Sequence, residues 1–359
     1  MADIAERSQD FGANSWLVEE MYEQFRSDPA SVSEAWREFF SDYKPMTSQP
    51  GGTLPPAERS APPSPAAPGT NGSATPSVPA PTGGKAPAAA AAPSAAPAAD
   101  NAAEPIRGAG AAIVANMERS LSVPTATSFR NVPARLLEVN RKAINDYRSR
   151  HGLSKVSFTH IIAYAIVRSI SDAVPVMRNS YAAGADGKPQ LVRNDHVNVG
   201  LAVDVDKGDG TRNLVVPVLR EADTMSFGQF LVAYDDLIRK VKANKLTIAD
   251  FQGANVSITN PGTIGTVQSV PRLMPGQGVI VGVGSIDYPA EFQGADEANL
   301  NTLGISKVVT ITSTYDHRII QGAESGLFLK RVHELLLGEH GFYDGVFADL
   351  EIPYRAVRW

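Results

Sequence analysis

The chain has 359 residues, a formal net charge of −5, and hydrophobic side chains at 43% of its positions. This length allows two domains, or one large domain with extensions, and the apolar content is sufficient for a sizeable core. The acidic balance, without a basic cluster, argues against nucleic-acid binding, which needs cations to displace counterions from phosphates. The chain contains no cysteine, which excludes disulfides, thiolate metal sites and a cysteine nucleophile.

No targeting or membrane segment is evident. The sequence has no run approaching the roughly 18 uninterrupted apolar residues that indicate a transmembrane helix. Residues 1–10 contain acidic side chains and no apolar run, so they resemble neither a signal peptide nor a transit peptide. We therefore expect a cytoplasmic protein that is not inserted in a membrane.

Two short helices are predicted near the N-terminus. The first covers residues 14–26 and ends before Pro29, and the second begins at a predicted capping box between Ser31 and Glu34. Their apolar faces carry Leu17, Met21, Phe25, Trp36, Phe39 and Phe40. So small a segment cannot bury three large aromatic side chains within itself. It either folds onto its own protein or docks onto a partner.

Residues 44–105 differ from the rest of the chain in composition. Residues 61–100 hold 15 Ala and 10 Pro, with one Lys, one Asp and no aromatic residue. Such a tract cannot bury enough apolar surface to offset its conformational entropy, and its prolines favour extended polyproline II segments. We predict a long, semi-rigid linker.

Residues 106–359 are predicted to form the folded body. Apolar periodicity predicts helices over residues 132–150, 158–170, 227–244 and 323–337, and strands over residues 197–205, 214–219, 255–259, 279–283 and 307–314. Asp209-Gly210 provides turn residues between the first two strands. This succession of helices and strands indicates a layered α/β domain with a mixed sheet.

Among the six histidines, only His317 is placed for chemistry. No histidine pair has the spacing of a zinc site with a third ligand nearby, so no metal site is predicted. His160 lies in an apolar helix and His196 opens a strand, so both are interpreted as structural; His151, His333 and His340 are interpreted as surface residues. His317 follows the strand that ends near Thr314 and lies between an acid and a base.

Two sequence motifs, one around His317 and one upstream of it, resemble motifs of a known family. The run Asp316-His317-Arg318-Ile319-Ile320-Gln321-Gly322 resembles the D-H-R-x-x-D-G signature of the dihydrolipoamide acyltransferases of 2-oxo acid dehydrogenase complexes. Residues 256–265, Val-Ser-Ile-Thr-Asn-Pro-Gly-Thr-Ile-Gly, resemble the T-I-T-N-x-G-x-x-G segment of the same family. The resemblance implies a fold similar to chloramphenicol acetyltransferase.

The resemblance also implies roles for individual residues. His317 would be the general base, and the hydroxyl of Thr259 would donate a hydrogen bond to the oxyanion of the tetrahedral intermediate. In the family these two groups come from different subunits of a trimer. Asp316 and Arg318 would hold the loop by ion pairing. Asn260 and Gly322 would support the site structurally.

Gln321 departs from the family pattern, since most members have Asp or Asn at this position. Gln cannot be ionised, so a role that needs a carboxylate would be lost, whereas a supporting hydrogen bond would survive. This position therefore leaves the catalytic rate open.

Residues 17–25, Asp28-Pro29, Val32, Trp36 and Phe39-Phe40 resemble the N-terminus of 2-oxoglutarate dehydrogenase decarboxylase components, where the segment attaches the decarboxylase to its complex. Residues 1–43 would then be a docking arm. Together with the linker and the acyltransferase signature, this arm resembles the fused 2-oxoglutarate dehydrogenases of actinobacteria, which join a succinyltransferase domain to a thiamine diphosphate-dependent decarboxylase.

That resemblance implies succinyl transfer between a dihydrolipoyl-lysine and coenzyme A, as part of 2-oxoglutarate oxidation in the tricarboxylic acid cycle. No lipoyl domain is evident, so a lipoyl-bearing acyltransferase would supply that group in trans, and lipoamide dehydrogenase would be a further partner. Thiamine diphosphate and Mg²⁺ would bind a decarboxylase part expected beyond residue 359. The chain would assemble as a homotrimer or a larger particle.

Two alternatives remain open. The trimer could be a non-catalytic scaffold that organises decarboxylase domains, with Gln321 a sign of lost chemistry. The chain could also be a free-standing acetyltransferase acting on small hydroxyl compounds, as chloramphenicol acetyltransferase does, although the linker and the N-terminal helices do not suit that function.

Overall fold

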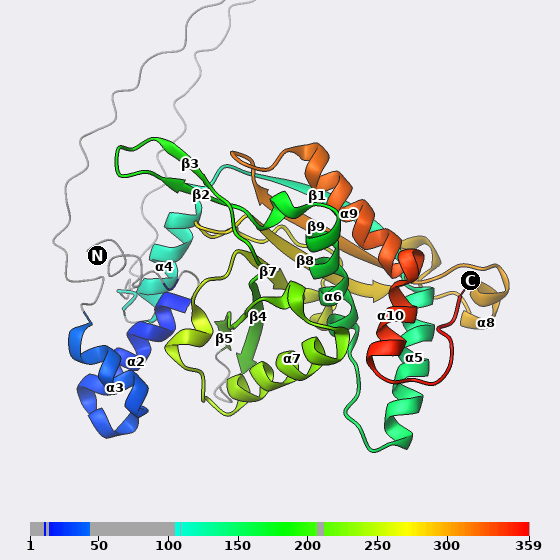
Figure 1. Cartoon of the computed structure of the whole chain (residues 1–359), viewed down its shortest axis with the longest axis horizontal. Helices are drawn as coiled ribbons and strands as arrows, with labels where there is room; N and C mark the ends of the chain where they lie inside the picture. The colour runs from blue at the N-terminus through cyan, green and yellow to red at the C-terminus, as the bar shows by residue number, and fades with distance from the viewer. Residues whose placement is uncertain (1–10, 12–13, 44–104, 108, 207–211, 359) are drawn as a thin grey trace, which may run out of the picture. The chain divides into compact units, whose positions relative to one another are not determined.

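The computed structural model describes residue 11 and residues 14–43, 105–107, 109–206 and 212–358 (Figure 1). The predicted linker, except for Pro105, lies outside these residues. The predicted turn at Asp209-Gly210 lies outside them as well.

A seven-stranded mixed sheet forms the centre of the body. Its strands are β1 (Thr125–Pro133), β4 (Val199–Asp206), β5 (Arg212–Val215), β6 (Val218–Leu219), β7 (Val256–Thr259), β8 (Val279–Asp287) and β9 (Val308–Asp316). The order is β1-β9-β8-β7-β4-β5, with β6 paired to β4. β7 runs parallel to β4 and β8, and the other pairs are antiparallel. The predicted layered α/β fold with a mixed sheet is confirmed.

The two faces of the sheet differ in chemistry because successive side chains point to opposite sides. On one face, Val256, Val279 and Tyr315 lie level across three neighbouring strands and belong to the main core. On the other face, Thr259, Gly282 and Thr312 are level in the same way. The core face is therefore apolar, and the opposite face carries small and hydroxyl-bearing residues.

Helices pack on the apolar face of the sheet (Figure 1). They are α5 (Arg135–Arg150), α6 (Phe158–Asp172), α7 (Phe227–Lys242), α9 (Gly322–Leu336) and α10 (Phe342–Asp349). α6 lies deepest, as its continuous apolar sequence predicts. Ser157 caps this helix, and the Ser157 N–H donates in return to Nδ1 of His160 over 3.2 Å. His160 is thus buried and structural, as predicted.

Several elements were not predicted. The hairpin of β2 (Ser180–Ala183) and β3 (Pro189–Val192) forms a separate two-stranded sheet that projects from the body (Figure 1). Three helices of the described residues were also not predicted: α4 (Ala109–Ser120), α8 (Glu297–Thr302) and α10. β1 was not predicted either, and the predicted helix overlaps only its last two residues, Val132 and Pro133.

The helix predicted over residues 132–150 is wrong at its start. Val132 and Pro133 end β1, and α5 begins at Arg135. A proline disfavours the helical conformation in the residue before it, so the chain stays extended up to this point. The buried face of α5 carries Leu136 and Ile144, whereas Val139 is 39% exposed.

Two local predictions are also wrong. The strand predicted over residues 214–219 is interrupted at Val216-Pro217, because proline lacks the N–H that a strand ladder needs. The capping box predicted between Ser31 and Glu34 does not form. Ser31 ends a short 3-10 helix, and Ser33 is the N-cap residue of α3 (Glu34–Asp42).

The N-terminal helices α2 (Ser15–Ser27) and α3 pack on their own body and belong to one compact unit with it. An apolar cluster joins the two parts: Phe11, Val18, Val32, Trp36 and Phe40 from the N-terminal segment, and Ala112, Val215 and Phe251 from the body. The buried Asn14 side chain donates to Val216 O over 2.9 Å and accepts from Val216 N over 2.7 Å. This pairing satisfies backbone groups just after β5, the end strand of the sheet.

Among the described residues, no helix is long and apolar enough to cross a membrane.

Candidate active site

His317 lies in the turn that follows β9. Its backbone N–H donates to Pro124 O over 2.9 Å, and its Nδ1 lies 3.1 Å from Ile320 O. A carbonyl oxygen can only accept, so Nδ1 carries the proton in this hydrogen bond. A neutral imidazole then has its lone pair on Nε2. The turn thus selects the tautomer in which Nε2 can accept a proton, and the side chain is exposed.

Asp316 and Arg318, on either side of His317, form an ion pair. Arg318 Nε lies 2.8 Å from Oδ1 of Asp316, and Nη2 lies 2.6 Å from Oδ2. The Asp316 side chain is 3% exposed and the Arg318 side chain 28%. The hydrogen bond from Asp316 raises the pKa of the Arg318 guanidinium, so this side chain stays charged. The backbone N–H of Arg318 also donates to Asp316 Oδ1.

Thr259 is the last residue of β7 and is half-buried. It points to the sheet face opposite the helical layer, because Ile258 before it lies in the main core. Within the described part of the chain, its hydroxyl has no hydrogen-bond partner. The next residue, Asn260, donates from Nδ2 to Oγ1 of Thr159 in the first turn of α6 over 2.8 Å. This contact fixes the start of the loop after β7.

Glycines allow the loop after β7 to lie close to β8. A Cβ atom on Gly262 would lie 2.2 Å from the backbone of Gly284, and one on Gly284 would lie 1.9 Å from Val267 O. Both contacts are far below van der Waals distance. Only glycine fits at these two positions, and their packing sets the path of the chain away from Thr259.

Thr259 and His317 do not meet within one chain. Thr259 is level with Gly282 and Thr312, whereas His317 lies five residues further along β9 and its turn. At about 3.3 Å per residue, this is a separation of roughly 16 Å along the strands, and two strand spacings add about 9.6 Å across them. The structure therefore does not bring the two predicted catalytic side chains together in a single protomer.

Gln321 is the N-cap residue of α9, and Gly322 is its first helical residue. The Gln321 N–H donates to Oε2 of Glu324 over 2.6 Å, which satisfies one of the free N–H groups at the helix start. Gln321 is exposed. Asp and Asn are stronger N-cap residues than Gln.

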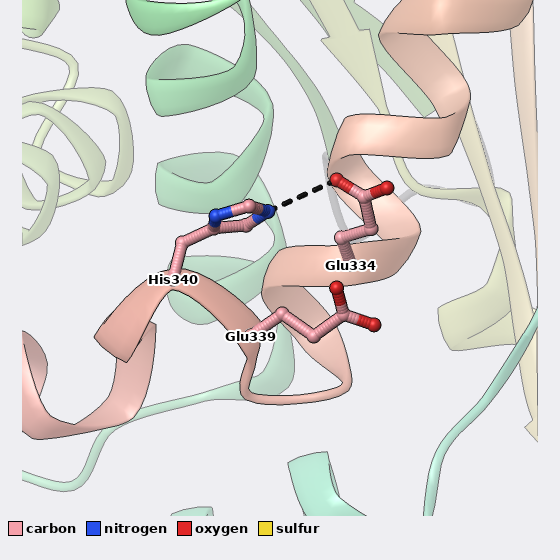
Figure 2. Close-up of side chains that lie close together, drawn as sticks. All are labelled: Glu334, Glu339 and His340. Atoms are coloured by element: carbon pink, nitrogen blue, oxygen red, sulfur yellow. Dashed lines mark hydrogen bonds and ion pairs between the residues drawn. The ribbon is translucent and has the colours of Figure 1, made fainter.

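A second cluster of ligand-type side chains lies at the other end of α9. Figure 2 shows Glu334, Glu339 and His340 close together, with His340 Nε2 3.1 Å from Oε2 of Glu334. Lys330 and Arg331 each lie 3.6 Å from the Glu334 carboxylate. The hydrogen bond from His340 lowers the pKa of Glu334. These cations already balance Glu334, and the geometry is that of an exposed ion-pair cluster.

The prediction for His333 is wrong in one respect. It was interpreted as a surface residue, but it is half-buried, and burial lowers its pKa. His151 and His340 are exposed, as predicted. His196 pairs with Asp223 over 3.2 Å at the entrance to β4.

The body thus combines a mixed sheet, helices on its apolar face, and a histidine just after the strand next to the β1 edge. The chain belongs to the 2-oxoacid dehydrogenase acyltransferase family, whose catalytic domain matches residues 98–340. Residues 8–47 match the 2-oxoglutarate dehydrogenase N-terminus. Both resemblances inferred from the sequence motifs are confirmed.

Among curated proteins, the multifunctional 2-oxoglutarate metabolism enzyme of Mycolicibacterium vanbaalenii is 50% identical over 370 residues, which cover 97% of this chain and 30% of that protein. The enzyme of the same description from Mycobacterium sp. strain KMS is 48% identical over 394 residues and is covered to 31%. The chain thus spans about a third of the length of these relatives.

Solved structures agree with the fold. A probable dihydrolipoamide acetyltransferase from Listeria monocytogenes aligns with a TM-score of 0.55 at 23% identity, covering 72% of this chain and all of that one. The cubic core of a pyruvate dehydrogenase multienzyme complex aligns with a TM-score of 0.52 at 26% identity, covering 66% and 88%.

Proposed function

We propose that this chain transfers a succinyl group between a dihydrolipoyl-lysine on a partner protein and coenzyme A. The observation that carries the proposal is the His317 turn, in which Ile320 O holds the proton on Nδ1 and leaves Nε2 free to act as a base. Membership of the acyltransferase family supplies the reaction class.

In the proposed reaction, His317 Nε2 takes the proton of the coenzyme A thiol as its sulfur attacks the thioester carbonyl. A carbon–sulfur bond forms and the carbonyl oxygen becomes an oxyanion, which accepts a hydrogen bond from the hydroxyl of Thr259. The intermediate collapses, the bond to the lipoyl sulfur breaks, and the imidazolium returns the proton to the departing thiolate. No covalent enzyme intermediate is needed, which suits a chain without cysteine.

The distance between His317 and Thr259 supports a site shared by two subunits. Because the two residues lie roughly 16 Å apart along the strands, each can meet the other kind of residue only in another copy of the chain. The similarity to the cubic core of a pyruvate dehydrogenase complex also favours assembly from such copies. We therefore include a homotrimer, or a larger particle built from trimers, in the proposal.

The remaining parts of the proposal concern the longer protein. The description of the relatives as 2-oxoglutarate metabolism enzymes favours succinyl as the acyl group. A lipoyl-bearing acyltransferase and lipoamide dehydrogenase would be partners in trans. Thiamine diphosphate and Mg²⁺ would bind parts of the protein outside this chain, which spans about a third of its relatives.

The role of residues 1–43 as a docking arm is also a proposal. In the packed state, the buried Trp36 and Phe40 side chains are occupied by the body. A partner would therefore bind the exposed surface of α2 and α3, or displace these helices from the body.

The test is an assay of succinyl and acetyl transfer between coenzyme A and free dihydrolipoamide, with the particle mass measured in parallel. We expect succinyl transfer by a trimer or larger particle. His317→Ala should lower the rate by more than tenfold without dissociating the particle, since general base catalysis is worth about 10²- to 10⁴-fold. A trimeric His317→Ala variant with a near-normal rate would sink the assignment of the base. A folded wild-type trimer that is inert with both acyl groups would favour the non-catalytic scaffold.

A further inference from the structure

The side chain of Tyr181, in the β2–β3 hairpin, contacts the His317 turn. The guanidinium carbon of Arg318 lies 3.6 Å from the centre of the Tyr181 ring. Arg318 therefore has its edge hydrogen-bonded to Asp316 while its face is stacked on Tyr181. An Arg over an aromatic ring is attracted to the negative face of the π-system.

The base of the hairpin is fixed against the same end of β9. A Cβ atom on Gly278 would lie 2.4 Å from Asn179 O and 2.5 Å from Met177 O, so the chain leading into β2 packs directly on this glycine. Gly278 O in turn accepts the backbone N–H of Asp316 over 3.0 Å. Gly278 thus joins the hairpin to the strand end that precedes His317.

A second set of contacts closes the hairpin at its base. Arg178 Nε donates to Asn194 O, and Asn194 Nδ2 donates to Arg178 O, both over 2.7 Å. Asn194 Nδ2 also lies 3.0 Å from the Ser180 hydroxyl. Tyr181 is the next residue, so its ring projects from a closed base rather than from a free strand.

The Asp316 side chain is hydrogen-bonded to Arg318 on the other side of His317. Its Oδ1 accepts both the backbone N–H and the Nε–H of Arg318. If Arg318 leaves this position, Asp316 loses its charged partner and the imidazole loses its fixed orientation. Displacing a catalytic group by about 1 Å can cost up to about 100-fold in rate.

We propose that Tyr181 is a positioning residue for acyl transfer: its ring holds Arg318 against Asp316 and thereby fixes the imidazole of His317. Tyr181 does not touch the reacting atoms. The inference rests on the proposed function, in which His317 is the base. It also assigns a role to the β2–β3 hairpin, which would otherwise be a projecting pair of short strands.

The experiment compares Tyr181→Ala, Tyr181→Leu and Tyr181→Phe in the full chain. We expect Tyr181→Ala and Tyr181→Leu to lower kcat about tenfold, with KM for coenzyme A changed less than about twofold, and Tyr181→Phe to stay within about threefold of wild type because it retains the ring face. Tyr181→Leu keeps apolar bulk, so it separates lost stacking from lost packing if the alanine variant folds poorly.

Tyr288→Ala is the matched control. Tyr288 is also half-buried and lies under a cation, with Lys307 Nζ 5.3 Å from its ring centre, but it has no contact with the His317 turn. We expect this variant to keep wild-type kcat and KM. An equal loss of kcat in the control would overturn the proposal, since it would show that removing a cation–aromatic contact far from the His317 turn lowers kcat as much.

A readout without activity keeps the two hypotheses distinct. The ¹⁵N shifts of the His317 ring, assigned by their loss in His317→Gln, report which nitrogen carries the proton. We expect one tautomer, protonated at Nδ1, in wild type and Tyr181→Phe, and a mixture of tautomers in Tyr181→Ala. If wild type is inactive, the proposed function fails and this spectrum alone decides the role of Tyr181. An unchanged His317 spectrum in Tyr181→Ala would overturn the positioning role.

Discussion

The Asp316–Arg318 pair combines a buried anion with a partly exposed cation. The carboxylate is almost inaccessible and depends on Arg318 for its charge balance. A buried charge that loses its partner is strongly destabilising, although the intact pair by itself adds little to stability. The bidentate geometry also requires a planar fork, which lysine does not have.

We expect Arg318→Ala to lower the free energy of unfolding by about 2–3 kcal/mol, because Asp316 would remain buried without a counterion. Chemical denaturation of the purified particle measures this loss. Arg318→Lys should recover only part of it. The double variant Asp316→Asn with Arg318→Ala should be less destabilised than Arg318→Ala, and a purely additive result would contradict the coupling.

A second prediction for a single residue concerns Gln321. Replacing this N-cap residue by Asn should raise the free energy of unfolding by about 0.5 kcal/mol, because Asn is among the strongest N-caps and Gln is not. Thermal unfolding measures the change. Glu324→Ala should have the opposite sign, since it removes the acceptor of the Gln321 N–H. A destabilised Gln321→Asn variant would show that Gln has a contact role beyond the cap.

His160 predicts acid sensitivity. Burial lowers its pKa below the ordinary 6.5, and this outweighs the attraction of Asp235, while Arg148 acts in the same direction as burial. Between the lowered pKa of the folded state and 6.5, the unfolded chain binds more protons than the folded chain. The contribution of neutral His160 to the free energy of unfolding is therefore fully present above about pH 6.5 and is lost as the pH falls below it. His160→Gln should reduce this loss, because Gln can accept the Ser157 N–H in the same capping box without titrating. Equal pH slopes for both proteins in urea titrations would exclude His160 as a cause.

At the scale of elements, the loop after β7 depends on glycine packing rather than on apolar burial. Gly262 and Gly284 approach each other's backbone, and the loop returns across β8 at Val267. The exposed Ile264, Val267 and Val270 side chains show that this loop is not held by a core of its own. Its position relative to Thr259 therefore follows from backbone contacts.

Gly284→Ala should lower the free energy of unfolding by about 2 kcal/mol or more, because the new methyl group would meet Val267 O and must displace the loop. We also expect reduced acyl transfer, since Thr259 begins this loop. Gly326→Ala is the matched control. Gly326 lies in α9 with open space at its Cβ position, so alanine there should stabilise the chain by about 0.5–1 kcal/mol. A tolerated Gly284→Ala variant would show that the loop can relax at little cost.

At the scale of the whole molecule, the N-terminal helices protect one end of the sheet. β5 is an end strand, and such strands expose unpaired backbone groups unless something covers them. Asn14 satisfies both backbone groups of Val216 next to this strand, and Trp36 donates from Nε1 to Leu246 O. The segment is thus held by specific hydrogen bonds as well as by apolar contact.

Trp36→Ala should release this segment without unfolding the body, because removing a buried tryptophan costs about 3–5 kcal/mol and Trp36 belongs to the cluster that joins the segment to the body. Limited proteolysis at Arg26 and Arg37 should then become faster, while acyl transfer remains close to wild type. Resistance to trypsin equal to that of the wild type would show that the other contacts are sufficient.

The shared site gives a prediction for the assembled particle. Particles of His317→Ala chains and of Thr259→Ala chains should each transfer acyl groups poorly. Trimers that contain both kinds of chain should recover up to about a third of the wild-type rate, because one of their three subunit interfaces would combine an intact His317 with an intact Thr259. Co-expression with two affinity tags isolates these mixed particles. Absence of recovery would indicate that both residues act within one chain.

The sequence determined those features whose cause is local. The deep burial of α6 follows from its continuous apolar run, the end of α9 follows from Gly338, and the family follows from short motifs around Thr259 and His317. The start of α5 was predicted wrongly because Val132 and Leu136 have the spacing of a helix. Val132 instead pairs with Val309 of the distant β9 and is therefore in a strand.

The tertiary structure decided what depends on residues far apart in the chain. It placed Thr259 level with the middle of β9 and His317 beyond the end of that strand, since register depends on strand pairing and not on local sequence. It also placed Tyr181 against Arg318, 137 positions further along the sequence, and packed the N-terminal aromatic side chains on the body. Local propensity carries no information about such contacts, because their free energy is gained only when the chain is folded.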